Sequence, residues 1–244
     1  MHMKCLAIIP ARGGSLRIPR KNIKAFCGQP IIAYSIAAAL RSGCFSEIMV
    51  STEDDEIAAV AAHCGAKIPF KRSFRTADNY ATLVDVVEEV VRDYRKIDIY
   101  FDYVCCILAT APFITTGMVQ QSYEILINRS ADAVISVVRF DYPIQRGLKL
   151  EDGFIRMMWP ENYEKRSQDL ESVYHDAGLF YWLRTESLLR QKRFYMERSI
   201  PFELSHANVH DIDTLEDWQI AEFKYMFFHN ANKLKQANDG AAYK

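Results

Sequence analysis

The chain has 244 residues, half of them hydrophobic and a quarter charged, which is typical of a soluble globular protein. Its 30 Lys and Arg residues nearly balance its 31 Asp and Glu residues, so its net charge of −1 exerts no general attraction on nucleic acid or on an anionic membrane. The six cysteines form no C-x-x-C pair, which predicts a reduced, cytoplasmic protein without a zinc site. We therefore expect neither nucleic acid nor a membrane as a partner, and an anionic ligand must meet a local cluster of cations.

Short apolar runs alternate with amphipathic segments along the first half of the chain. The pattern predicts strands at 4–9, 48–51, 67–70, 102–108 and 133–138, and helices near 31–42, 52–64, 81–95 and 119–127. Strands separated by helices pair in parallel, and a parallel sheet is buried on both faces, which accounts for the continuous apolar runs. The sequence therefore predicts an α/β fold, a mostly parallel sheet with helices on both faces.

The alternation weakens after residue 140. We expect an insertion over about 140–176 that carries a small hairpin around Asp152 and Gly153. Regular structure is predicted again at 178–183 and in a last helix from Thr214 to Phe228, which is followed by a polar tail over 229–244 that we expect to fray. The chain is thus predicted to be one domain over 1–228, with one small inserted subdomain.

The greatest density of ligand-binding side chains follows the first predicted strand. The segment 10–22 contains Arg12, Gly13, Gly14, Ser15, Arg17, Lys21 and Asn22. The glycines let the backbone turn tightly and bring its N–H groups close to a ligand, while arginine and lysine bind phosphate oxygens. The segment is neither G-x-x-x-x-G-K-[ST] nor G-x-G-x-x-G, so neither a P-loop nor a dinucleotide fold is indicated. A solvated basic turn is the alternative, but the pattern favours a triphosphate site.

Two carboxylates, Asp211 and Asp213, flank Ile212 just before the last predicted helix. Alternate residues of an extended segment point the same way, and Mg²⁺ prefers one or two carboxylates together with waters and phosphate oxygens. Asp213 can instead serve as the N-cap of the helix, with Glu216 completing a capping box. Because that alternative does not explain Asp211, the pair predicts a Mg²⁺ site.

Four motifs together resemble those of the acylneuraminate cytidylyltransferases. They are ARGGS…RIPRKN at 11–22, VSTED at 50–54, TAPF at 110–113 and DIDT at 211–214. The resemblance extends from residue 5 to residue 225, and KRSQDL…YHDAGLFYW at 165–182 is similar to the pseudaminic acid branch of the family. It implies a Rossmann-like fold, a homodimer, a requirement for Mg²⁺, and transfer of CMP from CTP to a nine-carbon α-keto acid sugar for glycan biosynthesis such as flagellin glycosylation.

The resemblance also implies roles for the matching residues. The residues expected to bind the nucleotide are those of the 10–22 segment together with Arg72, Thr82 and Thr110. The expected catalytic residues are Arg12 and Lys21, which would stabilise developing charge, and Asp211 and Asp213, which would hold Mg²⁺. Leu16 stands where the family usually has a phosphate-binding lysine, and we expect Arg17 to take its place.

The insertion and the residues that follow it supply the expected sugar ligands. They are Gln145, Arg146, Arg166, Gln168, His175 and Asp176. An arginine suits the sugar carboxylate and a glutamine suits hydroxyl and acylamino groups, although a lone histidine such as His175 is often a packed, hydrogen-bonded residue. The turn at 175–178, HDAG, differs from the arginine-containing RPNG-like turn of the sialic acid enzymes, which favours a different sugar.

Other functions stay open at this point. One is a cytidylyltransferase for sialic, legionaminic or 3-deoxy-octulosonic acid. Another, motivated by Leu16, is a catalytically silent protein that binds nucleotide sugars. Release of pyrophosphate from CTP in the presence of a sugar separates an enzyme from a binding protein, and a panel of sugars separates the enzymes.

Overall fold

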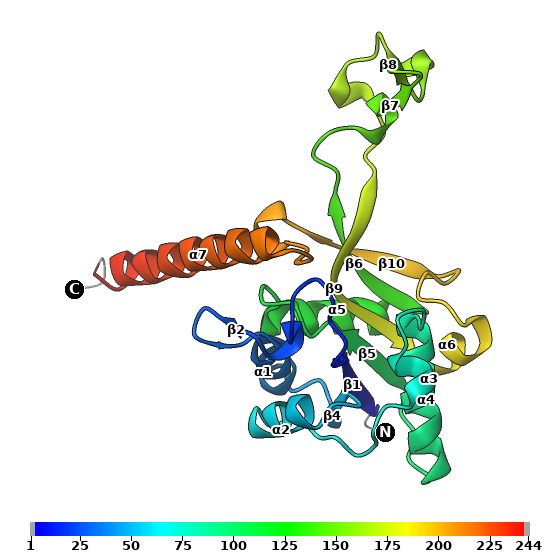
Figure 1. Ribbon diagram of the computed structural model, residues 1–244, viewed down its shortest axis with the longest axis vertical. Coiled ribbons are helices and arrows are strands. Elements are labelled where there is room, and N and C mark those ends of the chain that lie inside the picture. Colours follow the sequence, from blue (N-terminus) through cyan, green and yellow to red (C-terminus); the bar gives the residue numbers. More distant parts are fainter. Residues whose placement is uncertain (1–2, 242–244) are drawn as a thin grey trace.

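A six-stranded sheet forms the centre of the molecule (Figure 1), in a computed structural model that describes residues 3–241. Residues 1–2 and 242–244, the outermost residues of the predicted domain and tail, lie outside the described part.

The strand order is β10–β6–β9–β5–β1–β4. Their bounds are Cys5–Pro10 (β1), Glu47–Ser51 (β4), Tyr103–Ile107 (β5), Ala133–Arg139 (β6), Tyr174–Arg184 (β9) and Ser199–Leu204 (β10). All neighbours pair in parallel except β9, which runs antiparallel between β5 and β6. The predicted mostly parallel α/β fold is confirmed.

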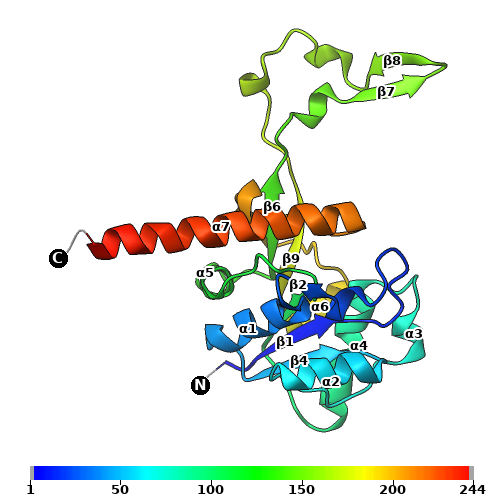
Figure 2. The same ribbon diagram turned by 60° about the vertical axis from the view of Figure 1, so that its left-hand side comes forward.

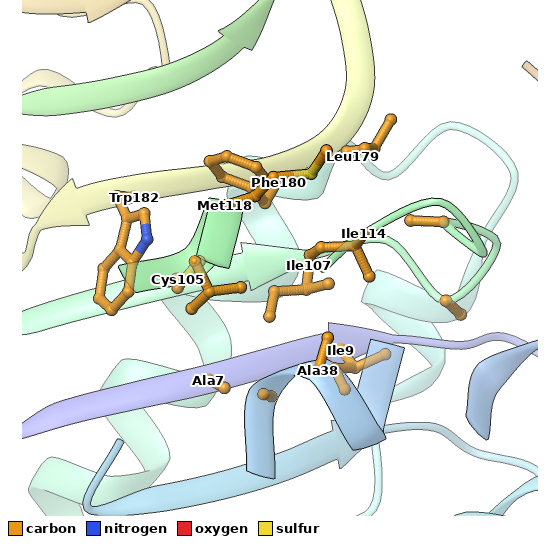
Figure 3. Packing of buried hydrophobic residues seen from close by; sticks show 14 of the residues in the cluster. Ala7, Ile9, Ala38, Cys105, Ile107, Ile114, Met118, Leu179, Phe180 and Trp182 are labelled. Atoms are coloured by element: carbon orange, nitrogen blue, oxygen red, sulfur yellow. The ribbon is translucent and has the colours of Figure 1, made fainter. Parts of the chain in front are cut away.

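Helices cover both faces of this sheet. On one face lie α1 (Ile32–Ser42), α2 (Asp55–His63) and α5 (Thr116–Asn128), and on the other lie α4 (Leu83–Lys96) and α6 (Thr185–Gln191). Because side chains alternate along a strand, Ala7 and Ile9 of β1 join the first core cluster while Leu6 and Ile8 join the second. Figure 3 shows Ile9 beside Ala38 of α1 in the first cluster. The two clusters fix the carboxyl end of β1, where the 10–22 loop begins.

Two predictions in the N-terminal half were wrong. Residues 67–70 form only an isolated bridge between Met49 and Lys67, because Pro69 has no N–H with which to extend a ladder. Helix α2 begins at Asp55 and not at residue 52, since its N-cap is Asp54, whose carboxylate accepts the Ile57 N–H at 2.9 Å.

Two elements in the C-terminal half were not predicted, α6 and β10. Strand β10 contains Pro201, which usually argues against a strand. It is tolerated here because β10 lies at the edge of the sheet and pairs only with β6. The strand therefore carries the chain back across the sheet towards the segment that ends at Asp213.

Residues 140–173 project from the sheet as an arm (Figures 1 and 2), whose base is formed by the ends of β6 and β9. The arm carries the predicted hairpin, β7 (Leu148–Glu151) and β8 (Phe154–Met157). Asp152 and Gly153 both have positive φ, 53° and 79°, as a two-residue hairpin turn of type I′ requires. Several large apolar side chains of the arm are exposed, among them Leu148, Leu150, Phe154 and Ile155.

Helix α7 (Leu215–Ala241) leaves the body of the molecule and extends beyond its predicted end at Phe228. Residues 229–241, which were predicted as part of the tail, include three Ala and two Lys and contain no proline, so they continue the helix. Within the described part of the chain, no helix has both the length and the apolar character needed to cross a bilayer.

The N-cap of α7 is Thr214, so the predicted capping box of Asp213 and Glu216 is wrong. Thr214 Oγ1 accepts the Asp217 N–H at 3.1 Å, and the Asp217 carboxylate accepts the Thr214 N–H at 2.7 Å. The box is displaced by one residue because the helix begins one residue later than expected. Asp213 is thereby released from capping.

A third apolar cluster joins the 10–22 loop to α7. Ile18 of the loop, Phe26 of β2 (Ala25–Phe26) and Trp218 of α7 are all buried, and the Phe26 ring meets the Trp218 ring edge-on at 5.6 Å. Ile212 belongs to the same cluster and is 2% exposed. Burial of Ile212 holds the neighbouring Asp213 next to the loop, where its Oδ2 lies 2.7 Å from Arg17 Nη1.

Candidate active site

A cavity of about 440 Å³, the first cavity, opens beyond the carboxyl ends of β1 and β5. Ligands of parallel α/β sheets bind at such positions. The 10–22 loop, the segment from Arg72 to the start of α4, and Thr110 form its walls. Its lining includes Arg12, Ser15, Arg17, Lys21, Asn22, Arg72, Thr82 and Thr110. The fold thus brings together every side chain that the sequence predicted to bind the nucleotide, glycines excepted.

The 50–54 segment clamps the 10–22 loop from behind. Glu53 Oε1 accepts the Gly13 N–H at 2.7 Å. A Cβ atom on Gly13 would lie 2.7 Å from Asp54 Oδ2, which is closer than real Cβ atoms approach. Neither Gly13 nor Gly14 has a positive φ. Glycine is therefore needed at position 13 for the close approach of Asp54, and not for a left-handed turn.

Arg20 fastens the other end of the loop to the same segment. It adopts a left-handed conformation with φ of 55°, and its guanidinium pairs with Asp54, at 2.9 Å for one of the two contacts, and with Glu56. Hydrogen bonds from Arg20 lower the pKa of Asp54 to about 2. The unusual backbone conformation of a non-glycine residue is held in place by these ion pairs.

The three loop cations that line the first cavity, Arg12, Arg17 and Lys21, each have an acceptor partner. Arg12 Nη1 donates to Asn79 Oδ1 at 2.6 Å, and Arg17 Nη1 lies 2.7 Å from Asp213 Oδ2. Lys21 donates to the Ile212 carbonyl and lies 3.5 Å from Asp213 Oδ1. Positive charge from separate parts of the loop therefore converges on one cavity, as recognition of a polyphosphate requires.

Arg72 brings a buried cation to the same cavity. It is only 7% exposed, its Nε donates to Ser51 Oγ at 3.1 Å, and burial lowers its pKa. Its Nη2 has no hydrogen-bond partner among the described residues. A buried donor without an acceptor is costly, so an anion placed beside this guanidinium would be bound strongly.

Two predicted nucleotide ligands also hold the structure of the site. Asn22 is 8% exposed, and its Nδ2 donates to the Arg12 carbonyl at 2.9 Å, which ties the two ends of the loop together. Thr82 is the N-cap of α4 and forms a capping box with Asp85. Both side chains still line the first cavity.

A second cavity of about 710 Å³ lies at the start of α4, where Thr82 and Leu83 line it as well as the first cavity. Asp176 lies in it, where its carboxylate accepts hydrogen bonds from the hydroxyls of Tyr181 and Tyr195, each at 2.8 Å. The sequence interpretation missed both tyrosines. For Tyr195 the sequence did offer a signal. It is adjacent to Phe194, and this aromatic pair lies between charged residues and outside any apolar run.

The other predicted sugar ligands lie away from both cavities. The arm carries Gln145, Arg146, Arg166 and Gln168 and projects away from the 10–22 loop (Figure 2). His175, at the base of the arm, packs its ring 4.7 Å from that of Phe140, and its Nδ1 lies 2.9 Å from the Asp176 carbonyl. Within one chain, only Asp176 of the predicted set lines the second cavity.

A family model described as Cytidylyltransferase matches residues 6–244. The chain belongs to the cytidylyltransferase family. It is 42% identical over 230 residues to a pseudaminic acid cytidylyltransferase of Campylobacter jejuni, across 94% of this chain and 99% of that protein. It is 32% identical to a CMP-N,N'-diacetyllegionaminic acid synthase of Legionella pneumophila, across 90% of this chain and 95% of that protein.

Solved structures of other enzymes share the fold of this cytidylyltransferase. One is a CMP:2-keto-3-deoxy-manno-octonic acid synthetase complexed with CTP, with a TM-score of 0.65 and 17% identity over 93% of this chain and 99% of that one. Another is a 4-diphosphocytidyl-2C-methyl-D-erythritol synthase of Anaerococcus prevotii, with a TM-score of 0.65 and 15% identity over 93% of this chain and all of that one. The predicted Rossmann-like fold is confirmed.

The clamp behind the loop predicts opposite outcomes for the two neighbouring glycines. In Gly13→Ala the new methyl group must displace Asp54, which Arg20 holds in place, and such overpacking costs about 1–3 kcal/mol of unfolding free energy. Gly14→Ala is the matched control, because a Cβ there meets nothing within 4 Å, and its effect should stay below about 0.5 kcal/mol. Chemical denaturation measures both. Equal midpoints for the two variants would rule out the clamp.

Proposed function

We propose that this chain transfers CMP from CTP to the anomeric hydroxyl of pseudaminic acid and releases pyrophosphate. The observation that carries the proposal is the convergence of Arg12, Lys21 and the buried Arg72 on one cavity at the carboxyl ends of the strands. The 42% identity to a pseudaminic acid cytidylyltransferase over nearly the full length of both chains supports the choice of nucleotide and of sugar.

In this reaction the anomeric oxygen attacks the α-phosphorus of CTP. A bond forms between these two atoms, the bond from the α-phosphorus to the bridging oxygen of the β-phosphate breaks, and the hydroxyl proton leaves. Arg12 and Lys21 bind the β- and γ-phosphates and stabilise the charge that develops on pyrophosphate. Thr110, on the loop after β5, lies where it can contact the base. Arg17 lines the same cavity as the exposed Leu16 and supplies the cation that Leu16 lacks.

Asp211 and Asp213 are the residues that would hold a Mg²⁺ ion. Asp213 has no capping duty and its carboxylate meets Arg17 and Lys21 at the rim of the first cavity. Among the described residues no group of three or more His, Cys, Asp or Glu side chains is arranged to hold a metal, but Mg²⁺ needs only one or two carboxylates when phosphate oxygens and waters complete its shell. Bound Mg²⁺ would neutralise phosphate charge and lower the pKa of a coordinated hydroxyl.

The second cavity is the proposed place for the sugar. It borders the first cavity at Thr82 and Leu83, and we expect a sugar there to present its anomeric hydroxyl to the α-phosphate. Its lining includes the cations Arg75, Arg92, Lys192 and Arg193. A cation among them suits the carboxylate of an α-keto acid sugar, and the tyrosine hydroxyls suit its polar substituents.

We also propose that the enzyme acts as a homodimer in the cytoplasm. A lone two-stranded hairpin is marginally stable in water, and Leu150 and Ile155 of the arm are 77% and 69% exposed, so a second copy is the expected cover. Its arm would also bring Gln145, Arg146, Arg166 and Gln168 to the sugar bound by its partner. All six cysteines are free thiols, which suits a reducing compartment.

Pyrophosphate release with CTP and a panel of sugars tests the proposed function. We expect turnover with pseudaminic acid to be much faster than with N,N'-diacetyllegionaminic, N-acetylneuraminic or 3-deoxy-octulosonic acid, because a site left with an unpaired buried polar group discriminates strongly. Equal rates with pseudaminic and N-acetylneuraminic acid would contradict the sugar assignment. CTP binding in calorimetry without pyrophosphate release from any sugar would identify a silent binding protein.

The aspartate pair is tested by separating metal binding from helix capping. Asp211→Asn and Asp213→Asn should each lower kcat by roughly 10²-fold, as does the loss of a group that stabilises transition-state charge. Unfolding free energy should change by less than about 0.5 kcal/mol, since neither residue caps α7. Removal of divalent metal from the parent enzyme should reproduce the loss of activity.

Thr214→Ala is the matched control for this pair. It should cost about 1 kcal/mol of stability through the lost N-cap and keep normal dependence on Mg²⁺. Normal Mg²⁺-dependent turnover of Asp211→Asn would show that the metal is held elsewhere.

A further inference from the structure

Strand β9 is sharply bent where it crosses β6. Ile135 pairs with Tyr181, whereas Val137 pairs with Asp176, so residues 177–180 of β9 lie opposite Ser136 alone. Ser136 Oγ closes this bulge, because it donates to the Phe180 carbonyl at 2.9 Å and accepts the Phe180 N–H at 3.1 Å. Bulges beside a site re-aim a side chain, and this one turns the Asp176 carboxylate back along its own strand.

The Asp176 carboxylate accepts three hydrogen bonds there. Its Oδ1 accepts the Gly178 N–H at 2.8 Å, in a turn that Gly178 permits through its φ of +62°. Its Oδ2 accepts from the hydroxyls of Tyr181 and Tyr195, each at 2.8 Å. Burial, followed by the neighbouring carboxylate, raises the pKa of Tyr195 to about 12 and that of Tyr181 further. Both phenols therefore keep their protons at neutral pH.

The direction of these hydrogen bonds determines what the cavity wall can recognise. A phenol has a single hydrogen to donate, and each tyrosine donates it to Asp176. The remaining lone pairs of the two hydroxyl oxygens can therefore only accept. Tyr181 and Tyr195 line the second cavity together with Phe194, whose ring packs 4.8 Å from that of Tyr181. The wall thus presents two fixed acceptors, which suit N–H and O–H groups of a ligand.

We propose that Asp176 is a positioning residue that sets the choice of sugar, because it holds the hydroxyls of Tyr181 and Tyr195 as acceptors for acylamino N–H and hydroxyl donors. The proposal rests on the proposed function and deepens it. Without the carboxylate, each phenol can rotate its hydrogen towards the cavity and compete with the sugar's own donors. Asp176 acts through the tyrosines, so its loss should affect binding of the sugar and leave the chemical step on CTP unchanged.

Steady-state kinetics of Asp176→Asn and Tyr195→Phe test this role. Asp176→Asn should raise the KM for pseudaminic acid roughly 10-fold, the effect of one or two lost hydrogen bonds, while KM for CTP and kcat change less than about twofold. Tyr195→Phe leaves the bond between Asp176 and Gly178 intact, so it tests the same wall even if Asp176→Asn disturbs the bulge. It should raise the sugar KM by a smaller factor. The double variant should be no worse than Asp176→Asn, because the two groups act as one unit.

A matched control and a second measurement separate positioning from a general structural role. Glu186→Gln changes a carboxylate of α6 that pairs with Arg95 and lines neither cavity, and it should leave the sugar KM unchanged. Because Tyr195 is one of 13 tyrosines, its ionisation is isolated as the difference in ultraviolet absorbance between each enzyme and its Tyr195→Phe derivative. This difference should titrate at lower pH in the Asp176→Asn background than in the parent and Glu186→Gln backgrounds, since a nearby negative charge that disfavours phenolate is gone.

Measurements on the parent enzyme test the proposed function, and measurements on the variants test the positioning role of Asp176. Failure of the parent enzyme to use pseudaminic acid would overturn the proposed function. A folded Asp176→Asn variant with unchanged sugar KM, or with equal increases in the KM values for sugar and CTP, would overturn the positioning role of Asp176, whichever sugar the parent prefers.

Discussion

The clamp between the 10–22 loop and the 50–54 segment is the constraint on which the first cavity depends. Glu53 accepts a hydrogen bond from the Gly13 N–H. Asp54 pairs with Arg20 at the far end of the loop and is also the N-cap of α2. Each contact uses a carboxylate behind the loop, and Arg12, Arg17 and Lys21 line the first cavity in front of it. A loop fixed in this way loses little entropy when it binds a polyphosphate, and preorganised donors are the ones that stabilise developing charge.

The aspartate pair flanks a packed residue, and the carboxylate of Asp213 also pairs with Arg17 and Lys21. Ile212 is buried between Ile18, Phe26 and Trp218, and this cluster draws together residues nearly 200 positions apart in the chain. Thr214 and Asp217 cap α7 without help from Asp213. The two flanking carboxylates can therefore serve a ligand, and changes to them should report on chemistry more than on folding.

The local motifs of the sequence were sufficient to predict most of the first cavity. Two of its binding segments, the 10–22 loop and the loop that carries Thr110, follow directly on β1 and β5, whose apolar runs are unmistakable, and parallel strands bring their carboxyl ends to one edge. Features that depend on distant partners could not be predicted in this way. The antiparallel course of β9, the direction of the arm and the bulge opposite Ser136 follow from sheet pairing, and the N-cap at Thr214 rests on a one-residue shift that composition does not reveal.

A crystal structure with CTP and Mg²⁺ tests the central claim of a preorganised nucleotide loop most directly. We expect triphosphate oxygens within hydrogen-bond distance of Arg12, Lys21 and Arg72, with the backbone of the 10–22 loop unchanged and the bond between Gly13 and Glu53 intact. CTP bound outside the first cavity, or a loop that must break its bond to Glu53 before the nucleotide can enter, would contradict it.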